Sequence, residues 1–364
     1  MERQGGALED LVIDPRFWSK RRVFLTGHTG FKGSWLALWL SRMGAEVFGY
    51  SLVPPTTPSL FNVAQVESKI ADHVISDIRD AIALTRAMER AAPDIVMHLA
   101  AQPLVRYSYA EPVETFETNV MGTVNVFEAV RTIGSVKAMV SVTTDKCYLN
   151  REWLWPYRED EALGGHDPYS ASKACAEIVG AAYRSSFSSD GPWIASARAG
   201  NVIGGGDWAL DRIVPDALRA IESGATMRLR SPGAVRPWQH VLEPLSGYVA
   251  LAQRLYDEGS RFATAWNFGP DDADARPVSW IVEKLAAMDN RLRWIMDGAP
   301  SVHEAGLLKL DSSRARSLLG WKPRWNLEEA LARTMEWHHA WTSGSDMAAI
   351  CGEQIDRYIG GKNV

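Results

Sequence analysis

Two residues four positions apart, Tyr169 and Lys173, could perform acid–base chemistry together. Pro168 suits the first turn of a helix and the Ser- and Ala-rich run after it favours helix, so both side chains should share one helical face. A phenol is a poor base at neutral pH, but an ammonium group beside it favours the phenolate. Such a phenolate could take a proton from a sugar hydroxyl while hydride leaves the same carbon. This spacing is a common chance match, so the interpretation depends on what precedes it.

A short apolar run, a glycine-rich turn and a helical pattern lie near the start of the chain. Residues 22–26 read as a buried parallel strand, the turn at 27–33 (GHTGFKG) follows directly, and apolar residues recur at helical spacing over 34–43. In this order, small residues let the backbone approach a pyrophosphate on the helix N-terminal amides. The three-and-three glycine spacing resembles that of short-chain dehydrogenase/reductases. We expect cofactor contacts from Gly27, Thr29, Gly30, Phe31, Lys32 and Gly33.

Apolar runs alternate with helical patterns as far as residue 198. This alternation predicts the α/β class, with a doubly wound, parallel, Rossmann-type sheet. Open sheets of this kind bind ligands beyond the carboxyl ends of their strands, which is where Thr144, Asp145 and Lys146 follow the fifth strand. Strands are expected at residues 22–26, 46–51, 74–79, 95–102, 138–142 and 193–198, and a long helix at 113–133.

The ends of the second and third strands bear on the adenosine half of a dinucleotide. An acid at the end of the second strand would favour NAD and a basic group NADP, but Tyr50 and Ser51 are neither. Asp77 and Ile78, at the end of the third strand, could hold the adenine. It is equally consistent with the sequence that Asp77 is only a solvated residue at the end of a strand. The strand ends therefore leave the choice of cofactor open.

The pattern becomes less regular after residue 198, with amphipathic helices near 213–223, 244–258 and 278–288. We therefore predict two units. Residues 1–198 form the NAD-binding domain, including the Tyr/Lys helix. Residues 199–350 form mainly a smaller α/β substrate-binding lobe, from which a strand or helix could return to the first domain, and residues 351–364 form a tail.

Composition narrows the class of partner. The chain has 364 residues with a net charge of -5 and no long basic cluster, which argues against nucleic acid or an anionic membrane as partner. No apolar run approaches a membrane span, and the polar, acidic start is unlike a signal peptide. Three widely spaced cysteines fit reduced thiols better than disulfides or a zinc site. We expect a cytoplasmic protein with a small-molecule partner and no metal.

Several motifs together resemble the extended short-chain dehydrogenase/reductase family over nearly the whole chain. They are the glycine turn, LAAQ at 99–102, NVMGT at 119–123, Tyr169 with Lys173, and RAGN at 198–201. Within that family, Thr144-Asp145-Lys146 resembles the nucleotide-sugar 4,6-dehydratases. Longer strings at 27–35, 143–148, 206–208 and 236–244 are similar to the branch that acts on CDP-glucose.

The resemblance implies an NAD-dependent hydro-lyase and a role for each site residue. Tyr169, polarised by Lys173, would remove the proton of the sugar 4-hydroxyl, with Thr144 as the second hydroxyl partner. Asp145 would be the general acid for the departing 6-hydroxyl, which requires burial to raise its pKa by roughly three units. Lys146 stands where related dehydratases have Glu, so we expect it, in neutral form, to take the proton on carbon 5.

The resemblance also implies the contacts to cofactor and substrate. It implies a homodimer or homotetramer as well, through the four-helix contact usual in the family. Further cofactor contacts are expected from Leu99, Ala100, Ala101 and Asn119, and substrate contacts from Arg106, Asn201, Arg212, Arg236, His240 and Glu304.

Three alternative functions stay open at this stage. A different nucleotide-sugar 4,6-dehydratase, or a 4-epimerase or decarboxylase of the same family, would share the cofactor half and the tyrosine. An epimerase needs no acid for a leaving hydroxyl, so Asp145 discriminates between the two reactions. A non-catalytic dinucleotide-sensing protein would have no use for Tyr169, Lys173 and Asp145 together.

Overall fold

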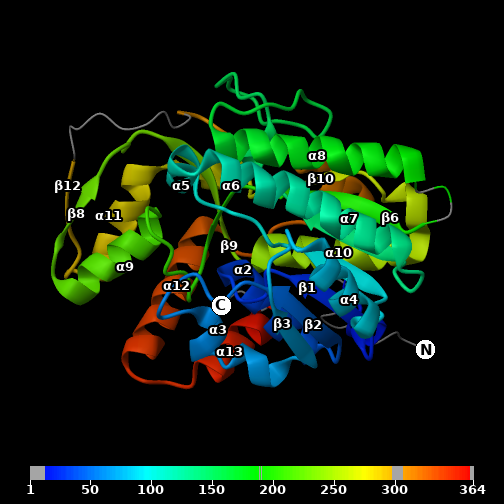
Figure 1. Ribbon diagram of the computed structural model, residues 1–364. Coiled ribbons are helices and arrows are strands. Elements are labelled where there is room, and N and C mark those ends of the chain that lie inside the picture. Colours follow the sequence, from blue (N-terminus) through cyan, green and yellow to red (C-terminus); the bar gives the residue numbers. More distant parts are fainter. Residues whose placement is uncertain (1–12, 188, 190, 297–305, 361–364) are drawn as a thin grey trace, which may run out of the picture.

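A seven-stranded parallel sheet forms the centre of the protein (Figure 1). The computed structural model describes residues 13–187, 189, 191–296 and 306–360. The strand order β10-β6-β5-β4-β1-β2-β3 reverses direction next to β1, as in a doubly wound sheet, so the predicted fold class is confirmed. The strands are β1 (Arg22–Thr26), β2 (Glu46–Ser51), β3 (Asp72–Ile75), β4 (Ile95–His98), β5 (Ala138–Val142), β6 (Trp193–Ala199) and β10 (Ala265–Phe268).

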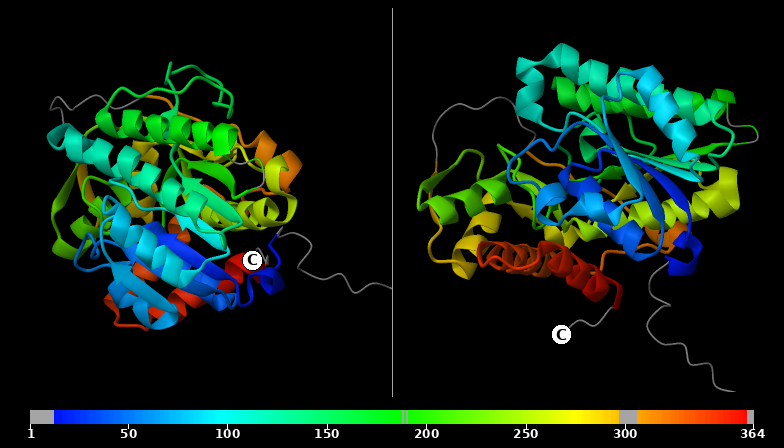
Figure 2. Two further views of the ribbon diagram at one scale, coloured as in Figure 1. Left: turned by 45° about the vertical axis from the view of Figure 1, so that its right-hand side comes forward. Right: turned by 60° about the horizontal axis from the view of Figure 1, so that its bottom comes forward.

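Helices cover both faces of this sheet (Figure 2). Val23 and Leu25 of β1 pack into the core with α2 and α10, whereas Phe24 points into a second core with α4 and α7. This alternation follows from the two-residue period of a strand buried on both faces. One layer contains α2 (Phe31–Arg42), α10 (Leu242–Glu258) and α13 (Met347–Gly360), and the other α4 (Ala81–Ala91), α7 (Gly122–Thr132) and α8 (Pro168–Phe187).

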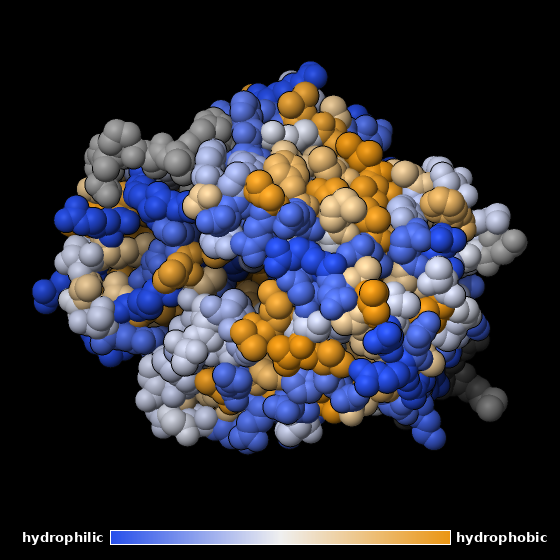
Figure 3. All heavy atoms as spheres, viewed as in Figure 1, coloured by the Kyte–Doolittle hydropathy of each residue, from blue (hydrophilic) through white to orange (hydrophobic). Residues whose placement is uncertain are grey.

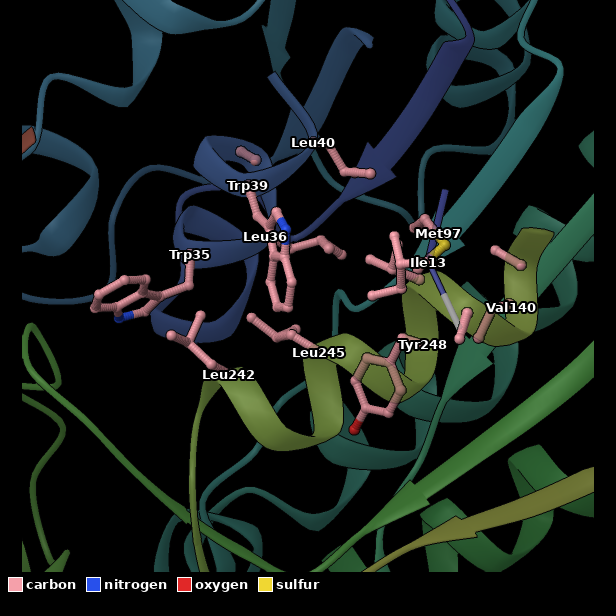
Figure 4. Close-up of a cluster of buried hydrophobic side chains, with 14 of the residues drawn as sticks. Ile13, Trp35, Leu36, Trp39, Leu40, Met97, Val140, Leu242, Leu245 and Tyr248 are labelled. Atoms are coloured by element: carbon pink, nitrogen blue, oxygen red, sulfur yellow. The ribbon is translucent and has the colours of Figure 1, made fainter. Parts of the chain in front are cut away.

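Large apolar side chains fix α2 against α10 and the sheet (Figure 4). Trp35 and Trp39 of α2 are fully buried, and Leu245 and Tyr248 of α10 lie beside them. Trp35 also donates from Nε1 to the carbonyl of Gly205, at 2.9 Å. This contact ties the helix that follows the glycine turn to the second lobe.

The second lobe has its own core and two small sheets. Its core joins Leu218, Trp238, Ile281 and Leu331. The lobe contains β7 (Asn201–Ile203), β9 (Val235–His240) and β11 (Ala275–Pro277) in one sheet, β8 (Thr226–Leu229) and β12 (Arg293–Met296) in another, and α9 (Ile213–Ser223), α11 (Val278–Met288) and α12 (Leu327–Thr342). The shorter elements are α1 (Pro15–Trp18), α3 (Leu60–Val63), α5 (Val105–Ala110), α6 (Pro112–Phe116), η1 (Val66–Lys69), η2 (Glu117–Met121), η3 (Asp145–Cys147), η4 (Gly259–Arg261), η5 (Asp272–Asp274) and η6 (Ala315–Leu319).

The structure corrects several predicted boundaries. The tail predicted from residue 351 is a packed helix as far as Gly360, because Cys351, Ile355 and Tyr358 are buried against α2 and α10. The helix predicted over 113–133 is interrupted by the π-helical turn η2. β3 ends at Ile75 and β4 at His98, before the predicted ends at 79 and 102.

Segments from beyond residue 198 return to the first domain, as the prediction allowed. β10 pairs in parallel with β6 at the edge of the main sheet, and α10 packs on the same sheet.

Within the described ranges, no helix has the length and apolarity needed to cross a membrane.

Candidate active site

The carboxyl ends of β5 and β6 and the first turns of α8 bring the predicted catalytic residues together. Thr144 caps η3, and its hydroxyl accepts a hydrogen bond from the backbone N–H of Lys146 at 3.3 Å. α8 packs against η3, so Tyr169 and Lys173 face this turn. Lys173 Nζ donates to the carbonyl of Val142, the last residue of β5, at 3.0 Å. The sheet edge therefore positions both halves of the predicted catalytic group.

Asp145 is a buried carboxyl with one oxygen free. Only 1% of the residue is exposed, and Oδ1 accepts a hydrogen bond from the Thr144 hydroxyl at 3.0 Å. Oδ2 has no hydrogen-bond partner among the described residues. Burial raises the pKa of Asp145, while Lys146, Thr144, Arg236 and Lys32 oppose the rise. The direction of this shift agrees with the prediction for a general acid.

Gly200 creates the space beside that free oxygen. A Cβ at this position would lie 3.1 Å from Asp145 Oδ2 and 2.5 Å from Pro237 Cγ. Any other residue would therefore fill the gap next to the acid. The RAGN motif indicated this segment, but sequence reasoning assigned no role to Gly200.

The chain's own residues do not make Tyr169 a strong base. Burial raises the pKa of Tyr169 to about 12, with the Thr144 hydroxyl opposing the rise by hydrogen bonding. Burial also lowers the pKa of Lys173 to about 8, although the negative charge of Glu177 opposes this shift. The ammonium that should stabilise the phenolate is thus itself easier to deprotonate than an ordinary lysine.

A buried ion pair, which sequence reasoning missed, supports this edge. Glu177 accepts hydrogen bonds from Thr143 Oγ1 at 2.5 Å, Ser196 Oγ at 2.7 Å and Arg198 Nη2 at 2.9 Å. Burial would raise the pKa of Glu177, but Arg198 and these donors hold it below its usual value. The pair links α8 to β5 and β6. Its only sequence signal is the spacing of Glu177, one helical turn after Lys173.

The glycine turn has the close packing that a dinucleotide site needs. Gly27 has a φ of +79°, and a Cβ there would lie 2.7 Å from the backbone nitrogen of Ala100. A Cβ at Gly33 would lie 2.0 Å from the carbonyl oxygen of Gly27. Gly30 caps α2 without a side-chain hydrogen bond, which leaves the first-turn amides facing the turn. The hydroxyl groups of Thr29 and Ser51 are hydrogen-bonded to each other at 2.8 Å.

Other predicted cofactor residues organise the backbone around this turn. Leu99 and Ala100 each donate a backbone N–H to Thr26 Oγ1 at 3.1 Å, and Ala101 follows them. Asn119 lies in the π-helical turn η2, and its side chain bonds to the backbone of Gln102 at 2.8 and 3.0 Å.

The predicted adenine contacts have partners within the chain. The Asp77 carboxylate accepts hydrogen bonds from Arg79 at 2.7 and 2.9 Å. Ile78 is buried beneath α7, where a Cβ on Gly122 would lie 2.6 Å from its Cδ1.

Cations from both lobes converge near Asp145 and Tyr169. Arg236 is buried and donates to the carbonyl of Val235 at 2.9 Å, and its positive charge favours the ionised form of Asp145. Arg212 pairs with Asp207 at 2.9 Å, and its positive charge favours the phenolate form of Tyr169. Burial, reinforced by Arg212, lowers the pKa of Lys32 to about 8, while Asp145 opposes the shift. Lys32 thus extends from the cofactor turn to the substrate side, which its place in the motif did not reveal.

The remaining predicted substrate contacts differ in support. Asn201 begins β7 and is partly exposed, and Arg106 pairs with Asp211 at 3.3 Å. His240 is fully buried between the rings of Trp35 and Trp325, and this position in the core gives it the least support. Glu304 lies outside the described residues. Among the described residues, no group of three or more His, Cys, Asp or Glu side chains could hold a metal ion.

The sequence is similar to those of known proteins. A profile of the family described as GDP-mannose 4,6 dehydratase matches residues 24–334. The chain belongs to this family. It is also 53% identical over 355 residues to CDP-glucose 4,6-dehydratase of Salmonella typhimurium, covering 96% of this chain and 99% of the relative. The resemblance to nucleotide-sugar 4,6-dehydratases of the extended short-chain dehydrogenase/reductase family is confirmed.

Solved structures at lower identity share the fold. UDP-glucose 4-epimerase of Stenotrophomonas maltophila, with bound NAD and formylated UDP-arabinopyranose, superposes with a TM-score of 0.78 at 21% identity, covering 89% of this chain and 100% of that one. dTDP-glucose 4,6-dehydratase of Bacillus anthracis in complex with NAD gives 0.72 at 20% identity, covering 90% and 99%. At these identities the likeness shows the fold.

Proposed function

We propose that the protein converts CDP-D-glucose to CDP-4-dehydro-6-deoxy-D-glucose and water, an early step of deoxysugar biosynthesis. The observation that carries this proposal is the near full-length match at 53% identity to a CDP-glucose 4,6-dehydratase. The site supports it, because a buried acid, Asp145, lies beside the hydroxyl group of Thr144, which would contact the sugar 4-hydroxyl during its oxidation. An epimerase would have no use for that acid.

The cofactor we assign is NAD. The close approaches at Gly27 and Gly33 and the uncapped start of α2 fit the pyrophosphate of a dinucleotide. Bound there, NAD would supply a reversible hydride acceptor, taking hydride from carbon 4 and returning it to carbon 6. The glycine turn, Asp77 with Ile78, residues 99–101, Asn119, Tyr169 and Lys173 are the proposed contacts.

The chain's own residues would handle the protons. Tyr169 and Thr144 would flank the 4-hydroxyl and remove its proton, and the resulting ketone acidifies carbon 5. Lys146 would take the carbon 5 proton while Asp145 protonates the departing 6-hydroxyl. Arg212, Arg236 and Asn201 would hold the substrate's pyrophosphate, for which the fixed fork of an arginine is well suited.

The reaction and its substrate can be tested together by mass spectrometry. The enzyme is incubated with a panel of nucleotide glucoses, and products lacking one water are quantified. We expect the highest specificity constant for CDP-glucose, because a pocket that hydrogen-bonds the cytosine amino group leaves unpaired groups with uracil or thymine. Comparable specificity constants for dTDP-glucose and CDP-glucose would contradict the substrate. Stoichiometric release of reduced cofactor during steady turnover would contradict the reaction.

Domain roles and assembly complete the proposal. Residues 1–198 would bind NAD and residues 199–350 mainly the nucleotide sugar, with α13 belonging to the packed core. We further propose a homodimer, or a dimer of dimers, formed through the helices that carry Tyr169 and Asn119. The cytoplasmic location expected from the sequence stays a prediction.

A further inference from the structure

We propose that Tyr148 and Arg198 are positioning residues that hold the turn η3 against the main sheet for the elimination step. This turn carries Asp145 and Lys146, the proposed acid and base for loss of water across carbons 5 and 6, so the inference rests on the proposed dehydratase function. Neither Tyr148 nor Arg198 would touch the sugar. Their task would be to keep η3 at a fixed place relative to α8.

The backbone is anchored differently on the two sides of η3. Before the turn, Thr143 donates its backbone N–H to the carbonyl of Ala197 at 2.9 Å, which continues the pairing of β5 with β6. After the turn, the backbone of residues 147–149 bonds to residues 162–164, which lie in a loop. The downstream side of the turn therefore needs another contact to fix it to the main sheet.

The side chain of Tyr148 supplies this contact. Tyr148 is buried, and its hydroxyl accepts a hydrogen bond from Arg198 Nη1 at 2.8 Å and donates one to Asn267 Oδ1 at 2.7 Å. Arg198 of β6 and Asn267 of β10 are direct partners in the parallel register of these strands. Their side chains therefore stand on the same face of the sheet, with the tyrosine hydroxyl between them.

The amide of Asn267 fixes the direction of these hydrogen bonds. Its Nδ2 donates to the carbonyls of Tyr157 at 2.9 Å and Asp311 at 3.0 Å. Because carbonyl oxygens only accept, Oδ1 must be the atom that faces Tyr148, and the tyrosine hydroxyl must donate to it. The hydroxyl oxygen is then left to accept from Arg198. Each bond has one possible direction, so the place of Tyr148 is closely specified.

Arg198 connects the same contact to the helix of the catalytic tyrosine. Nη1 donates to Tyr148, while Nη2 pairs with Glu177 at 2.9 Å. Glu177 lies on α8, one helical turn after Lys173. A guanidinium is a planar fork whose donors keep a fixed geometry, and this one is buried. The fork thus fixes the position of η3 relative to α8.

The two steps of the reaction should depend on this anchor to different degrees. Thr144 directly follows the paired end of β5, and Tyr169 lies in the first turn of α8, so neither needs the Tyr148 hydroxyl for its place. Asp145 and Lys146 lie within the turn that Tyr148 closes. Because a displacement of about 1 Å can cost a reaction step about 10²-fold, loss of the anchor should slow elimination more than oxidation.

Tyr148→Phe tests the anchor, because it removes only the hydroxyl. NAD-loaded enzyme is mixed with CDP-glucose in a stopped-flow instrument, where absorbance of reduced nicotinamide measures oxidation and mass spectrometry of quenched samples measures dehydrated product. We expect elimination to fall by about 10-fold or more and oxidation to stay within about threefold of the wild type, so reduced nicotinamide should accumulate. KM for CDP-glucose should change by less than about threefold. An equal fall in both rates, or elimination at the wild-type rate, would overturn the proposal.

Tyr157→Phe is the matched control. Tyr157 is buried and stacks on Tyr148 with ring centroids 5.2 Å apart, but its hydroxyl bonds to Asn150 and to the backbone of Arg151. This variant should leave the ratio of the two rates unchanged. If it slowed elimination as selectively as Tyr148→Phe does, loss of any buried hydroxyl nearby would have the same effect, and the anchor would be refuted.

A second variant guards against poor folding. Both rates are measured on the same molecules, so incomplete folding lowers the amplitudes without changing the ratio of the rates. Arg198→Lys keeps a positive charge for Glu177 but cannot hold Glu177 and Tyr148 with two rigid arms, so it should also slow elimination selectively. An unselective loss in this variant would count against the proposal. If the wild-type enzyme itself neither reduces NAD nor dehydrates any nucleotide glucose, the proposed function fails instead.

Discussion

At the scale of single residues, the site is a balance between burial and nearby charge. Burial alone would neutralise Asp145, yet three cations lie close enough to favour its ionised form. The same burial lowers the pKa values of Lys32 and Lys173 to about 8. Lys32 and Lys173 can therefore exchange protons near neutral pH, which ordinary lysine side chains do not do.

Asp145→Asn should separate oxidation from elimination. Asn cannot donate a proton to the 6-hydroxyl, so dehydration should fall by about 10²- to 10⁴-fold, the usual contribution of a positioned acid. Oxidation at carbon 4 should continue, because Tyr169, and not Asp145, would take the proton of the 4-hydroxyl. Reduced nicotinamide should therefore accumulate on mixing with CDP-glucose, measured by absorbance, while mass spectrometry detects little dehydrated product. Dehydration at the wild-type rate would exclude Asp145 as the acid.

Lys146→Met tests the base for carbon 5. The hypothesis requires Asp145 to be protonated, because a carboxylate there would favour the Lys146 ammonium, whereas the neutral amine can accept the proton. Met keeps the length of the side chain but cannot accept a proton. Deuterium incorporation at carbon 5 from heavy water should collapse while oxidation at carbon 4 continues. If exchange stays near normal, Lys146 only stabilises the developing enolate, and water or Tyr169 moves the proton.

At the scale of elements, a buried carboxylate joins α10 to the C-terminal helix. Glu243 Oε1 accepts from the backbone of Trp325 at 2.7 Å, and Oε2 accepts from the backbone of Arg324 at 3.1 Å and from Tyr358 of α13 at 2.7 Å. Burial raises the pKa of Glu243 to about 7 in spite of these donors. The packing of α13 is thus linked, through Tyr358, to a carboxyl group whose pKa lies near neutrality.

This group should make folding stability depend on pH. Between the ordinary value of 4.5 and about 7, the folded protein binds more protons at Glu243 than the unfolded chain, so raising the pH through this window removes stability. The free energy of unfolding of the wild type, relative to Glu243→Gln, should be larger near pH ~4.5 than near pH ~8, by up to about 3 kcal/mol. Urea unfolding at both pH values measures the difference. Exposed Glu46→Gln is the control, and a pH-independent difference for Glu243→Gln would contradict the assignment.

At the scale of the whole molecule, α6, η2 and α8 carry a group of exposed apolar side chains. Figure 3 shows apolar residues over α7 and α8, on the face that Figure 1 presents. The exposed large apolar side chains on α6, η2 and α8 are Val113, Phe116, Met121, Ile178 and Phe187. Apolar patches of this kind commonly mark protein interfaces, so the proposed dimer contact is assigned to these helices.

Ile178→Glu should disrupt the proposed dimer. Ile178 is 57% exposed on α8, and burying a charge against a second copy without a partner is costly. Light scattering should give twice the chain mass for the wild type, or four times for a dimer of dimers, and the mass of one chain for the variant. Ile82→Glu on α4, where Ile82 is 66% exposed, is the matched control and should leave the mass unchanged. A monomeric wild-type protein would contradict the interface.

Local sequence patterns determined the sheet and the cofactor turn. The predicted bounds of β1, β2, β5, α9 and α11 agree with the structure, because continuous apolar runs and helical periodicity reflect burial of the segment itself. The need for glycine at positions 27 and 33 was also predictable, because a side chain at either position would collide with neighbouring backbone atoms. The grouping of Thr144, Asp145, Tyr169 and Lys173 followed from the topology, which places the ends of parallel strands along one edge.

Only the tertiary structure decided which distant groups share a charge environment. Glu177 and Arg198, which form a buried ion pair, belong to different elements. Gly200 and Asp145 are also far apart in the chain, and the space beside the Asp145 carboxyl exists because Gly200 has no side chain. The packed C-terminal helix was missed because its glycine-rich, polar end resembles a free tail, while its apolar face becomes evident only against α2 and α10. Proton affinity depends on burial and on charges brought near by folding, and neither is encoded in the local pattern of residues.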